Sequence, residues 1–452
     1  MPHSPQAYRP STALLDLGPD FWDPVAAADF PQTMLRYRND RAAASIGLAG
    51  LNEAEWLGHF GRFQPLPDTL PQPLALRYHG HQFRSYNPDI GDGRGFTFAQ
   101  MLDDRDRLMD LGTKGSGQTP YSRFGDGRLT LKGGVREILA TEMLEALNVP
   151  TSRTLSLIET GEALDRGDEP SPTRSAVLVR LSHGHIRIGS FQRLAWFQDE
   201  AAMRRLVDYV LVELHGQAPG DPVRMLANIV ERTAVLAARY MAAGFVHGVL
   251  NTDNINVTGE SFDYGPWRFA PTWDPGFTAA YFDHQGLYAF GRQPEAIGWN
   301  VAQLAATLRL VAESDPLIAA LEGFAGHFHP ALVEAMLWRL GVRPRGAEED
   351  RALVRALERT LRATQAPIDR LFFDAFGGRL PDSYDTEWDE VRSRLAPYAP
   401  RKERNHAYWS GEPCAMLIDE VEAIWGPVAA EDDWSRLDGK VAAIRAMGEA
   451  LA

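Results

Sequence analysis

One short segment near the middle of the chain combines a histidine, an asparagine and an aspartate at a constrained spacing. His247 and Asn254 lie seven positions apart, and Asp263 follows nine positions later in the triplet Asp-Tyr-Gly. Amide and carboxylate oxygens are the ligands that Mg²⁺ prefers in proteins. A chain that uses both side chains on one metal ion must fold so that residues 254 and 263 meet, and this limits its architecture more than any other feature.

The same spacing occurs in the catalytic loop of protein kinases, where His-Arg-Asp-x-x-x-x-Asn is followed by Asp-Phe-Gly. The catalytic Asp of that loop is replaced here by Val249. A carboxylate stands instead at Asp253, next to Asn254, where it is free to take a proton from an attacking hydroxyl. An ordinary Asx-rich turn would explain residues 251–254 alone, but not the spacing. The pattern predicts a kinase-related site with a displaced or missing base.

The bulk composition excludes several classes of function. The chain has 452 residues and a formal net charge of -14, from 46 basic and 60 acidic residues. An acidic surface disfavours nucleic-acid binding, and no apolar run approaches the ~20 residues that span a membrane. Residues 1–20 lack the basic start and apolar stretch of a secretory signal. We therefore expect a cytoplasmic location, without nucleic-acid or membrane partners.

The residue pattern divides the chain into three parts. Residues 1–70 are rich in Pro and aromatics and predict an irregular N-terminal extension. Residues 71–200 alternate strand-like runs with Gly-rich and Asp-rich turns, and residues 201–452 are mainly helical. We expect an α+β fold with a β-rich, nucleotide-binding N-lobe and a helical C-lobe, which is the bilobal plan of a kinase. Other α+β proteins share this order.

Within these parts, individual elements can be predicted. Apolar spacing indicates helices over residues 135–147, 205–215 and 223–243. Two strand-like runs, residues 154–158 and 175–180, predict a hairpin with a polar loop between them.

A candidate phosphate site follows a strand-like run at Lys114, which opens the run Lys-Gly-Ser-Gly-Gln. A lysine there can act as a point charge on a phosphate, and the glycines allow close approach of backbone N–H groups. Glu137 lies 23 residues later on one face of the predicted helix, where a half-buried carboxylate requires a cation. Lys114 is its natural partner, although a solvated Glu137 and an ordinary turn at Lys114 are the alternatives.

Further cations and glycines surround this lysine in the sequence. Gly91, Gly93 and Arg94 form one Gly-rich turn, and residues 124–128 form another. Together with the Gly-rich run at Lys114, they make three such turns within about 40 residues. This clustering favours a nucleotide-binding site over isolated turns. Two arginines seven positions apart, Arg180 and Arg187, could bracket a phosphate. The nearby pairs His79 with His81 and His183 with His185 lack zinc spacing, so we reject them as metal ligands.

Taken together, these residues resemble the selenoprotein O family, called YdiU in bacteria. The resemblance extends from about residue 21 to about residue 283 and is densest in four runs, which are residues 79–94, 114–123, 136–137 and 247–265. It implies a pseudokinase with a protein-kinase-like fold. Members transfer AMP from ATP to Ser, Thr or Tyr hydroxyls of proteins and release pyrophosphate, with the nucleotide reversed relative to kinases. Modification of the chain itself would be consistent with this activity.

The resemblance also implies a role for each matching residue. Asp253 is the catalytic base, Asn254 and Asp263 bind Mg²⁺ or Mn²⁺, and Lys114 forms an ion pair with Glu137. The implied ATP contacts are Gly91, Gly93, Arg94, Lys114, Asp126, Gly127, Arg180 and Arg187.

The chain departs from the family pattern in three places. Arg84 stands where a glycine is usual, residues 132–134 replace a more Ser-rich stretch, and residues 400–452 match poorly. Many relatives carry a regulatory disulfide near the C-terminus. Cys414 is the sole cysteine, so the chain cannot form one within itself.

Two other functions compete with AMP transfer. An atypical kinase would use Asp253 as base on the γ-phosphate, but Val249 counts against it because the hydroxyl would have to reach a displaced carboxylate. A non-catalytic ATP-binding scaffold would not need both metal ligands and a base.

Overall fold

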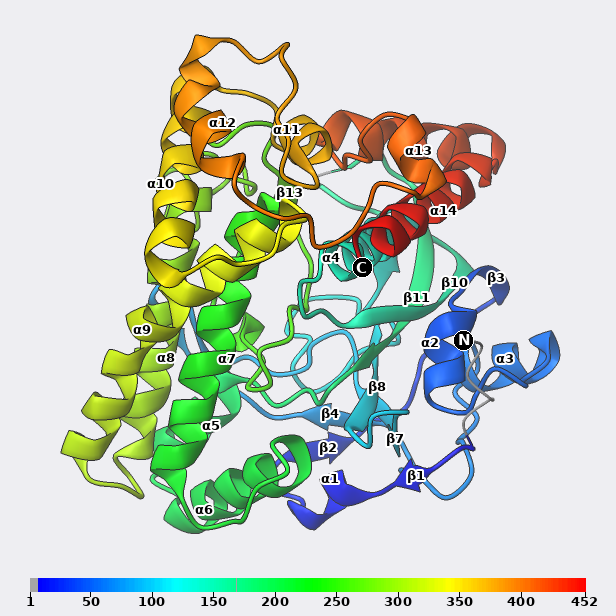
Figure 1. Cartoon of the computed structure of the whole chain (residues 1–452). Coiled ribbons are helices and arrows are strands. Elements are labelled where there is room, and N and C mark those ends of the chain that lie inside the picture. Colours follow the sequence, from blue (N-terminus) through cyan, green and yellow to red (C-terminus); the bar gives the residue numbers. More distant parts are fainter. Residues whose placement is uncertain (1–6, 168) are drawn as a thin grey trace.

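A computed structural model describes residues 7–167 and 169–452 of the chain. Its centre is a curled antiparallel sheet with the strand order β2-β4-β7-β8-β11-β10-β3, in which β1 pairs with β7 and β9 with β11 (Figure 1). The strands are β1 (Pro10–Ser11), β2 (Trp22–Pro24), β3 (Met34–Arg38), β4 (Leu74–Leu76), β5 (Gly80–Gln82), β6 (Ser85–Asn87), β7 (Thr97–Leu102), β8 (Leu108–Lys114), β9 (Leu129–Thr130), β10 (Arg153–Leu164), β11 (Thr173–Ser182), β12 (Phe245–Val246) and β13 (Arg268–Phe269).

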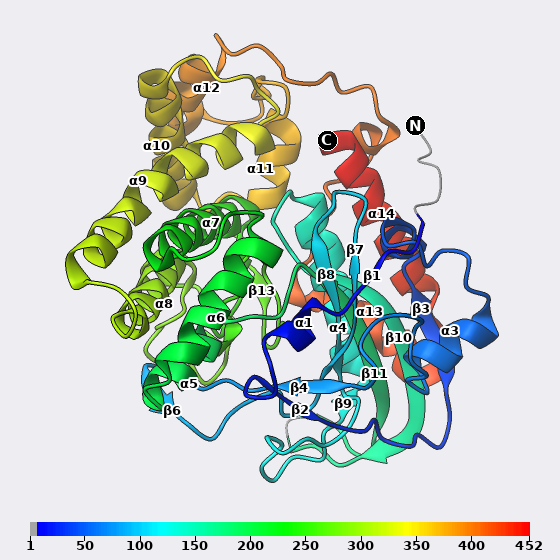
Figure 2. The same cartoon turned by 90° about the horizontal axis from the view of Figure 1, so that it is seen from below.

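Helices cover the sheet and form a second, larger body beside it. They are α1 (Ala13–Asp16), α2 (Asp40–Ser45), α3 (Glu53–Phe60), α4 (Leu131–Ala146), α5 (Ile188–Trp196), α6 (Glu200–Tyr209), α7 (Pro222–Ala243), α8 (Gln293–Leu308), α9 (Ser314–Arg339), α10 (Ala347–Thr364), α11 (Ile368–Ala375), α12 (Asp389–Leu395), α13 (Ile418–Glu431) and α14 (Ser435–Leu451). Figures 1 and 2 show α5 to α9 gathered on one side of the sheet and α2 and α3 on the other.

Shorter helical turns complete the secondary structure. A π-helical turn, η1 (Val210–Leu214), continues α6, and the 3-10 turns are η2 (Thr252–Asn254), η3 (Phe290–Arg292), η4 (Thr386–Trp388) and η5 (Ala407–Ser410).

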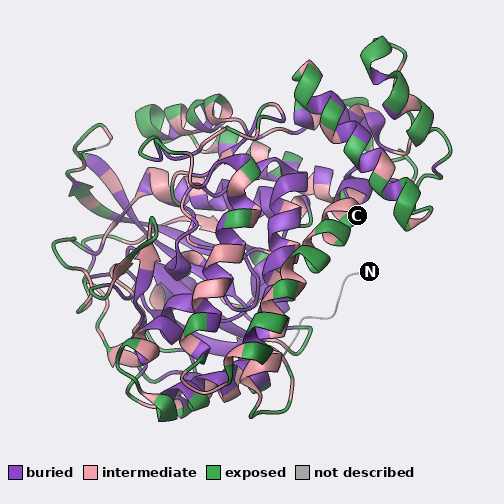
Figure 3. Cartoon of the chain, turned by 90° about the vertical axis from the view of Figure 1, so that its left-hand side faces the viewer, coloured by how far each residue is buried: buried purple, intermediate pink, exposed green. Residues whose placement is uncertain are grey.

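Both faces of the central strands are buried, and alternate residues face different layers. On β11, Ala176 and Leu178 belong to the core shared with α4, while Val177 and Val179 pack with the side chains of α2 and α3. The period of two follows from strand geometry. Figure 3 shows buried residues throughout the sheet and on the inner sides of the surrounding helices. Polar side chains on the α4 side of these strands are therefore enclosed.

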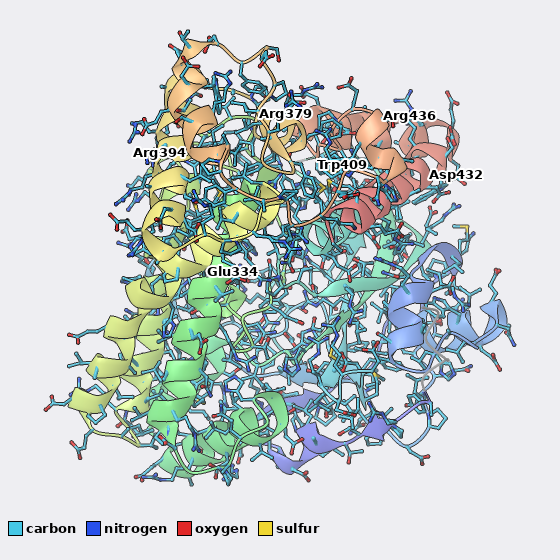
Figure 4. All side chains as sticks on the ribbon, viewed as in Figure 1. Glu334, Arg379, Arg394, Trp409, Asp432 and Arg436 are labelled. Carbon is cyan, nitrogen blue, oxygen red and sulfur yellow. The ribbon has the colours of Figure 1, made fainter. Side chains whose placement is uncertain are left out.

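Helix α4 is held between the sheet and the C-terminal helices. The Thr130 hydroxyl accepts a hydrogen bond from the Gly133 backbone N–H at 3.1 Å and so caps its first turn. One side of α4 packs on β10 and β11, and α13 and α14 cover it from outside. Asp432, labelled in Figure 4 at the turn between α13 and α14, accepts a hydrogen bond from Arg174 of β11 at 2.7 Å. The C-terminal region thus braces the sheet and α4 together.

The predicted elements can be compared with this structure. The mixed α/β content is confirmed, and the expected helices over 135–147 and 223–243 correspond to α4 and α7. The expected strands over 154–158 and 175–180 are the inner parts of the longer β10 and β11, whose loop includes residue 168, outside the described residues. Helix α6 ends at Tyr209 and a π-helical turn follows it, so the helix expected over 205–215 is interrupted.

Residues 1–70 are not irregular in their described portion. Strand β2 pairs with β4 and β3 pairs with β10, so this segment supplies both ends of the sheet, while residues 1–6 lie outside the described portion. Short strands of three to five residues flanked by Pro gave little periodic signal, and their pairing partners are far away in the sequence. The kinase-like bilobal arrangement and the three-part domain division stay predictions.

Within the described residues, no helix combines the length and the apolar character that crossing a membrane requires.

The strongest tie between α4 and the C-terminus is the ion pair of Glu142 with Arg445. Arg445 donates two hydrogen bonds to the carboxylate, at 2.8 and 2.6 Å, and Tyr37 donates a third at 2.6 Å. Burial alone would raise the pKa of Glu142, but these donors stabilise the charged form and hold its pKa below its usual range. The stabilisation is complete above the unfolded value near 4.5 and is lost as the pH falls through the lower folded value.

We therefore expect Glu142→Gln to lower the free energy of unfolding by about 3 kcal/mol at pH 7, because it leaves buried donors without a charged partner. Chemical denaturation of the variant and the native protein between pH 7 and pH 4 should show the difference shrinking below about pH 4.5. Glu145→Gln is the matched control, since Glu145 is 37% exposed and is bound to the exposed Arg41. A difference that does not change with pH would contradict this account.

Candidate active site

A cavity of about 740 Å³ opens between the sheet and the helical body. Every residue predicted to act on the nucleotide, the metal or the acceptor lines this cavity, and Glu137 lies directly behind it. The predicted residues in the lining are Gly91, Gly93, Arg94, Lys114, Asp126, Gly127, Arg180, Arg187, Asp253, Asn254 and Asp263. Val249, at the position of the kinase base, lines it as well. Tertiary structure thus brings together residues spread over more than 170 positions of the sequence.

Lys114 and Glu137 meet because β8 and α4 face each other. The Lys114 Nζ atom donates to Glu137 Oε2 at 2.6 Å and to the carbonyl of Tyr264 at 3.0 Å. Both side chains are buried, at 7% and 1% exposure. Burial lowers the pKa of Lys114, and Glu137 opposes this effect. The ion pair fixes a cation at the cavity wall and ties it to the backbone next to Asp263.

Asp263 is the shared hydrogen-bond acceptor of two arginines on the cationic side of the cavity. Its two carboxylate oxygens accept hydrogen bonds from different arginines, one from Arg180 and one from Arg187, the latter at 2.8 Å. Burial alone would raise the pKa of Asp263, but the two guanidinium groups lower it well below its usual range. Asp263 therefore carries a full negative charge that holds both arginines in the cavity.

His247 explains why the Asp-Tyr-Gly triplet lies beside the loop that contains Asn254. Its Nε2 atom is 2.9 Å from the carbonyl oxygen of Phe262, and the ring is buried. The backbone N–H of His247 donates to Gln293 of α8 at 3.0 Å. The first residue of the spacing thus anchors the segment that carries Asp263, which gives the spacing a structural reason.

Asp253 differs from the other carboxylates of the cavity. It lies in η2, is 8% exposed, and its Oδ1 atom has no hydrogen-bond partner among the described residues. The hairpin β5–β6 packs against it, because Gly80 is so close that a Cβ atom there would lie 2.7 Å from Oδ1. Burial raises the pKa of Asp253 to about 6, although Arg187 opposes the shift. An unpaired buried carboxylate oxygen is a strong proton acceptor.

The glycine-rich turns form the outer wall. Gly91 lies against the ring of Tyr121, whose hydroxyl donates to Asp23. Gly127 has a φ of +70°, and a Cβ atom at that position would overlap the carbonyl group of Gly117. Asp126 accepts two hydrogen bonds from Arg166, at 2.9 and 3.1 Å. Because these turns pack on one another, together they form the outer wall of the cavity.

Sequence reasoning missed two residues, Asp92 in the cavity lining and Phe262 buried behind it. Asp92 is a second partner of Arg187, at 3.3 Å, and also accepts from the backbone of Leu76 at 3.0 Å. Phe262 is fully buried under the guanidinium groups of Arg180 and Arg187, 5.2 and 4.8 Å from its ring centre. Both residues adjoin positions that were predicted, but nothing in the local sequence indicates that either is buried beside an arginine.

The oxygen donors of the cavity fit a metal that arrives with a nucleotide. Asn254 donates its Nδ2 hydrogen to the carbonyl of Val249 at 3.0 Å, so its Oδ1 atom is the end left for a cation. No group of three or more His, Cys, Asp or Glu side chains is arranged to hold a metal ion in the described portion of the chain. Mg²⁺ is commonly held by one or two protein oxygens together with phosphates and water. Asn254 and Asp263 suit that mode.

Comparison with known proteins gives consistent matches. A family model described as "Protein adenylyltransferase SelO" matches residues 6–396. A protein nucleotidyltransferase YdiU of Synechococcus elongatus is 43% identical over 95% of this chain and 93% of the relative. The protein of the same name from Gloeobacter violaceus is 44% identical over 94% and 92%, and that of a Synechocystis strain is 49% identical over 74% and 71%.

The outer wall leads to a prediction about Gly127. We expect Gly127→Ala to weaken ATP binding at least tenfold, because a side chain in a left-handed conformation costs about 1–2 kcal/mol and must also displace the Gly117 backbone. Isothermal titration with ATP measures the effect. Gly125→Ala is the control, since its added atom would meet only the Ser122 carbonyl, at 3.1 Å. Equal affinities of the two variants would show that the packing of Gly127 does not shape the nucleotide site.

Proposed function

Since this chain belongs to the SelO family, whose relatives are named protein nucleotidyltransferases, we propose that it transfers AMP from ATP to hydroxyl groups of proteins. The nucleotidyltransferase class follows from the family itself. The donor ATP and the Ser, Thr or Tyr acceptors, on other proteins and on this chain, are the finer parts of the proposal.

One observation carries the proposal beyond the family name. Asp253, which keeps one buried carboxylate oxygen without a hydrogen-bond partner among the described residues, lines the same cavity as Lys114, Arg180 and Arg187. Cations in a cavity of this size suit a triphosphate, and a buried carboxylate with one unpaired oxygen suits an incoming hydroxyl. A binding-only protein would have no reason to keep such an oxygen desolvated and unpaired, since that costs stability.

In the proposed reaction, Asp253 takes the proton of the acceptor hydroxyl. The hydroxyl oxygen then forms a bond to the α-phosphorus, and the bond between that phosphorus and the bridging oxygen of pyrophosphate breaks. Pyrophosphate leaves with the electron pair of that bond, and Lys114, Arg180 and Arg187 stabilise its charge. The nucleotide would lie reversed relative to kinases, so that its α-phosphate faces Asp253.

The remaining predicted residues hold the nucleotide. Gly91, Gly93 and Gly127 would let the backbone approach the phosphates, and Arg94 would bind one of them as a fork. Asp126 would position the Gly127 turn through its pair with Arg166. Glu137 would act through Lys114, whose Nζ atom it binds at 2.6 Å.

Asn254 and Asp263 would hold the Mg²⁺ or Mn²⁺ that comes with the nucleotide. When bound, such an ion neutralises phosphate charge and orients the triphosphate. Both oxygens of Asp263 are now engaged by arginines, and the phosphates would take over those arginines as the nucleotide enters.

The arrangement of the chain agrees with a kinase-like bilobal fold. Strands β7, β8, β10 and β11 with α4 would form the N-lobe within residues 71–200. Helix α5, within the N-lobe range, contacts the η2 turn that carries Asp253, and α8 packs on α5, α7 and α9, with α7 to α9 within residues 201–452.

Transfer of a radioactive label from ATP to protein tests the proposed reaction directly. We expect ATP labelled at the α-phosphate, with Mg²⁺ or Mn²⁺, to label this protein and proteins of a cell extract, and ATP labelled at the γ-phosphate to label neither. Gel autoradiography reads both. Label only from the γ-phosphate would make the protein a kinase, and bound ATP without any label would make it a scaffold.

Two isosteric variants separate base from metal ligand. We expect Asp253→Asn to lower transfer at least 100-fold while ATP affinity changes less than about threefold, because general-base catalysis contributes about 10²–10⁴-fold. Asp263→Asn should instead remove the Mg²⁺ dependence of ATP binding, measured by calorimetry with and without the ion. If Asp253→Asn lost affinity in proportion to its transfer rate, Asp253 would be a ligand of the nucleotide or its metal.

A further inference from the structure

His185 occupies a position that the proposed mechanism does not explain. It is 3% exposed, lies five residues after Arg180, and its ring lies against Gly112 of β8. The sequence offered it only as half of a histidine pair with His183, which was rejected as a metal site. The structure instead places its ring directly beside the guanidinium group of Arg180.

The space for this ring is created by a glycine. Gly112 of β8 is the direct cross-strand partner of Arg180 of β11. A Cβ atom on Gly112 would overlap Nε2 of His185, so any other residue there would expel the ring. Asp110, Gly112 and Lys114 alternate along β8 onto the same face of the sheet. The ring of His185 therefore lies on the face that carries the catalytic cations.

The hydrogen bonds determine which ring nitrogen carries the proton. Arg180 donates through Nε to His185 Nε2 at 3.1 Å, and a guanidinium group can only donate. His185 Nε2 must accept, so in the neutral ring the hydrogen is on Nδ1, which lies 3.2 Å from Asp110 Oδ2. Asp110 therefore selects the tautomer that can bind Arg180.

Asp110 is itself oriented by a directional chain of hydrogen bonds. Gln100, its cross-strand partner on β7, donates through Nε2 to Asp110 Oδ1 at 2.7 Å. The Gln100 Oε1 atom accepts from the backbone N–H of Leu14 at 2.7 Å. Because the Gln100 amide is fixed at both ends, Asp110 must accept on both of its oxygens. This is a task that an ionised carboxylate performs and an amide does not.

We propose that His185 is a positioning residue that sets the plane of the Arg180 guanidinium and thereby directs its Nη1 atom to Asp263 and the cavity. The inference rests on the proposed function, because it takes Arg180 to be a nucleotide contact. Phe262 helps to hold the Arg180 guanidinium in this plane. Its ring centre lies 5.2 Å from the guanidinium carbon of Arg180 and 6.2 Å from the ring centre of His185, in an edge arrangement. Arg180 is thus held by His185 at Nε, by Phe262 at its face and by Asp263 at its tip.

A double-mutant cycle between His185 and Arg180 tests this role. His185→Phe keeps a ring in the space but removes the acceptor, and we expect it to lower α-label transfer by roughly tenfold to hundredfold. In the Arg180→Ala background the same change should cost less than about threefold, because the group that His185 positions is gone. His185→Gln, whose side-chain oxygen can still accept from Arg180 Nε, should recover part of the loss.

His183→Phe is the matched control. His183 is two residues away and 6% exposed, and its ring nitrogens each lie 2.9 Å from main-chain carbonyl oxygens, of Leu108 and Leu214. We expect its effect on transfer to be the same in the native and in the Arg180→Ala background, even where the melting temperature falls. Equal losses for His185→Phe in both backgrounds, or a His185→Gln variant as impaired as His185→Phe, would overturn the proposal.

ATP affinity separates this inference from the proposed function. It is measured by calorimetry on the four proteins of the cycle, which are the native protein, His185→Phe, Arg180→Ala and the double variant. If the native protein binds ATP but transfers no α-label, the proposed function fails, while coupling between His185 and Arg180 in ATP affinity would still support the positioning role. If the native protein transfers the label and the cycle is additive in both affinity and transfer, the positioning role fails alone.

Discussion

The burial of three cations around one cavity is the constraint on which the rest of the structure depends. Lys114, Arg180 and Arg187 are each less than 10% exposed, and a buried charge is costly unless it is paired. Glu137 supplies the partner for the lysine, and Asp263 supplies it for both arginines. The sheet, α4 and the segment that carries Asp263 must therefore meet at one point, and the charges that hold them there are those that would bind the triphosphate in the proposed function.

The surrounding layers keep this charge cluster rigid. Helix α4 is fixed from inside by the sheet and from outside by the C-terminal helices, with Glu142 bound by Arg445 across 303 positions of the sequence. On the sheet side, the chain of hydrogen bonds from Gln100 through Asp110 to His185 reaches Arg180. The C-terminal helices, which lie beyond the residues 6–396 that the family model matches, are thus built into the support of the site.

Much of the site could be anticipated because its residues form short local patterns. The spacing of His247, Asn254 and Asp263 indicated one shared site, and these residues do converge, with His247 holding the carbonyl of Phe262. Their roles in metal binding and catalysis stay predictions. The N-terminal segment was misjudged, since β2 and β3 become strands only through pairing with β4 and β10, far from them in the sequence. Short strands carry too few residues for a periodic signal.

The resemblance carried by four local runs indicated the family and the roles of the candidate residues, while local spacing and periodicity indicated the mixed α/β content. The three-dimensional arrangement was needed to show which charges pair, that Asp253 keeps an unpaired oxygen, and that His185 reaches Arg180 over a glycine. The physical reason is that burial and hydrogen-bond partnership arise between strands and helices that are distant in the chain. The meaning of a buried polar residue is set by neighbours that its own segment does not contain.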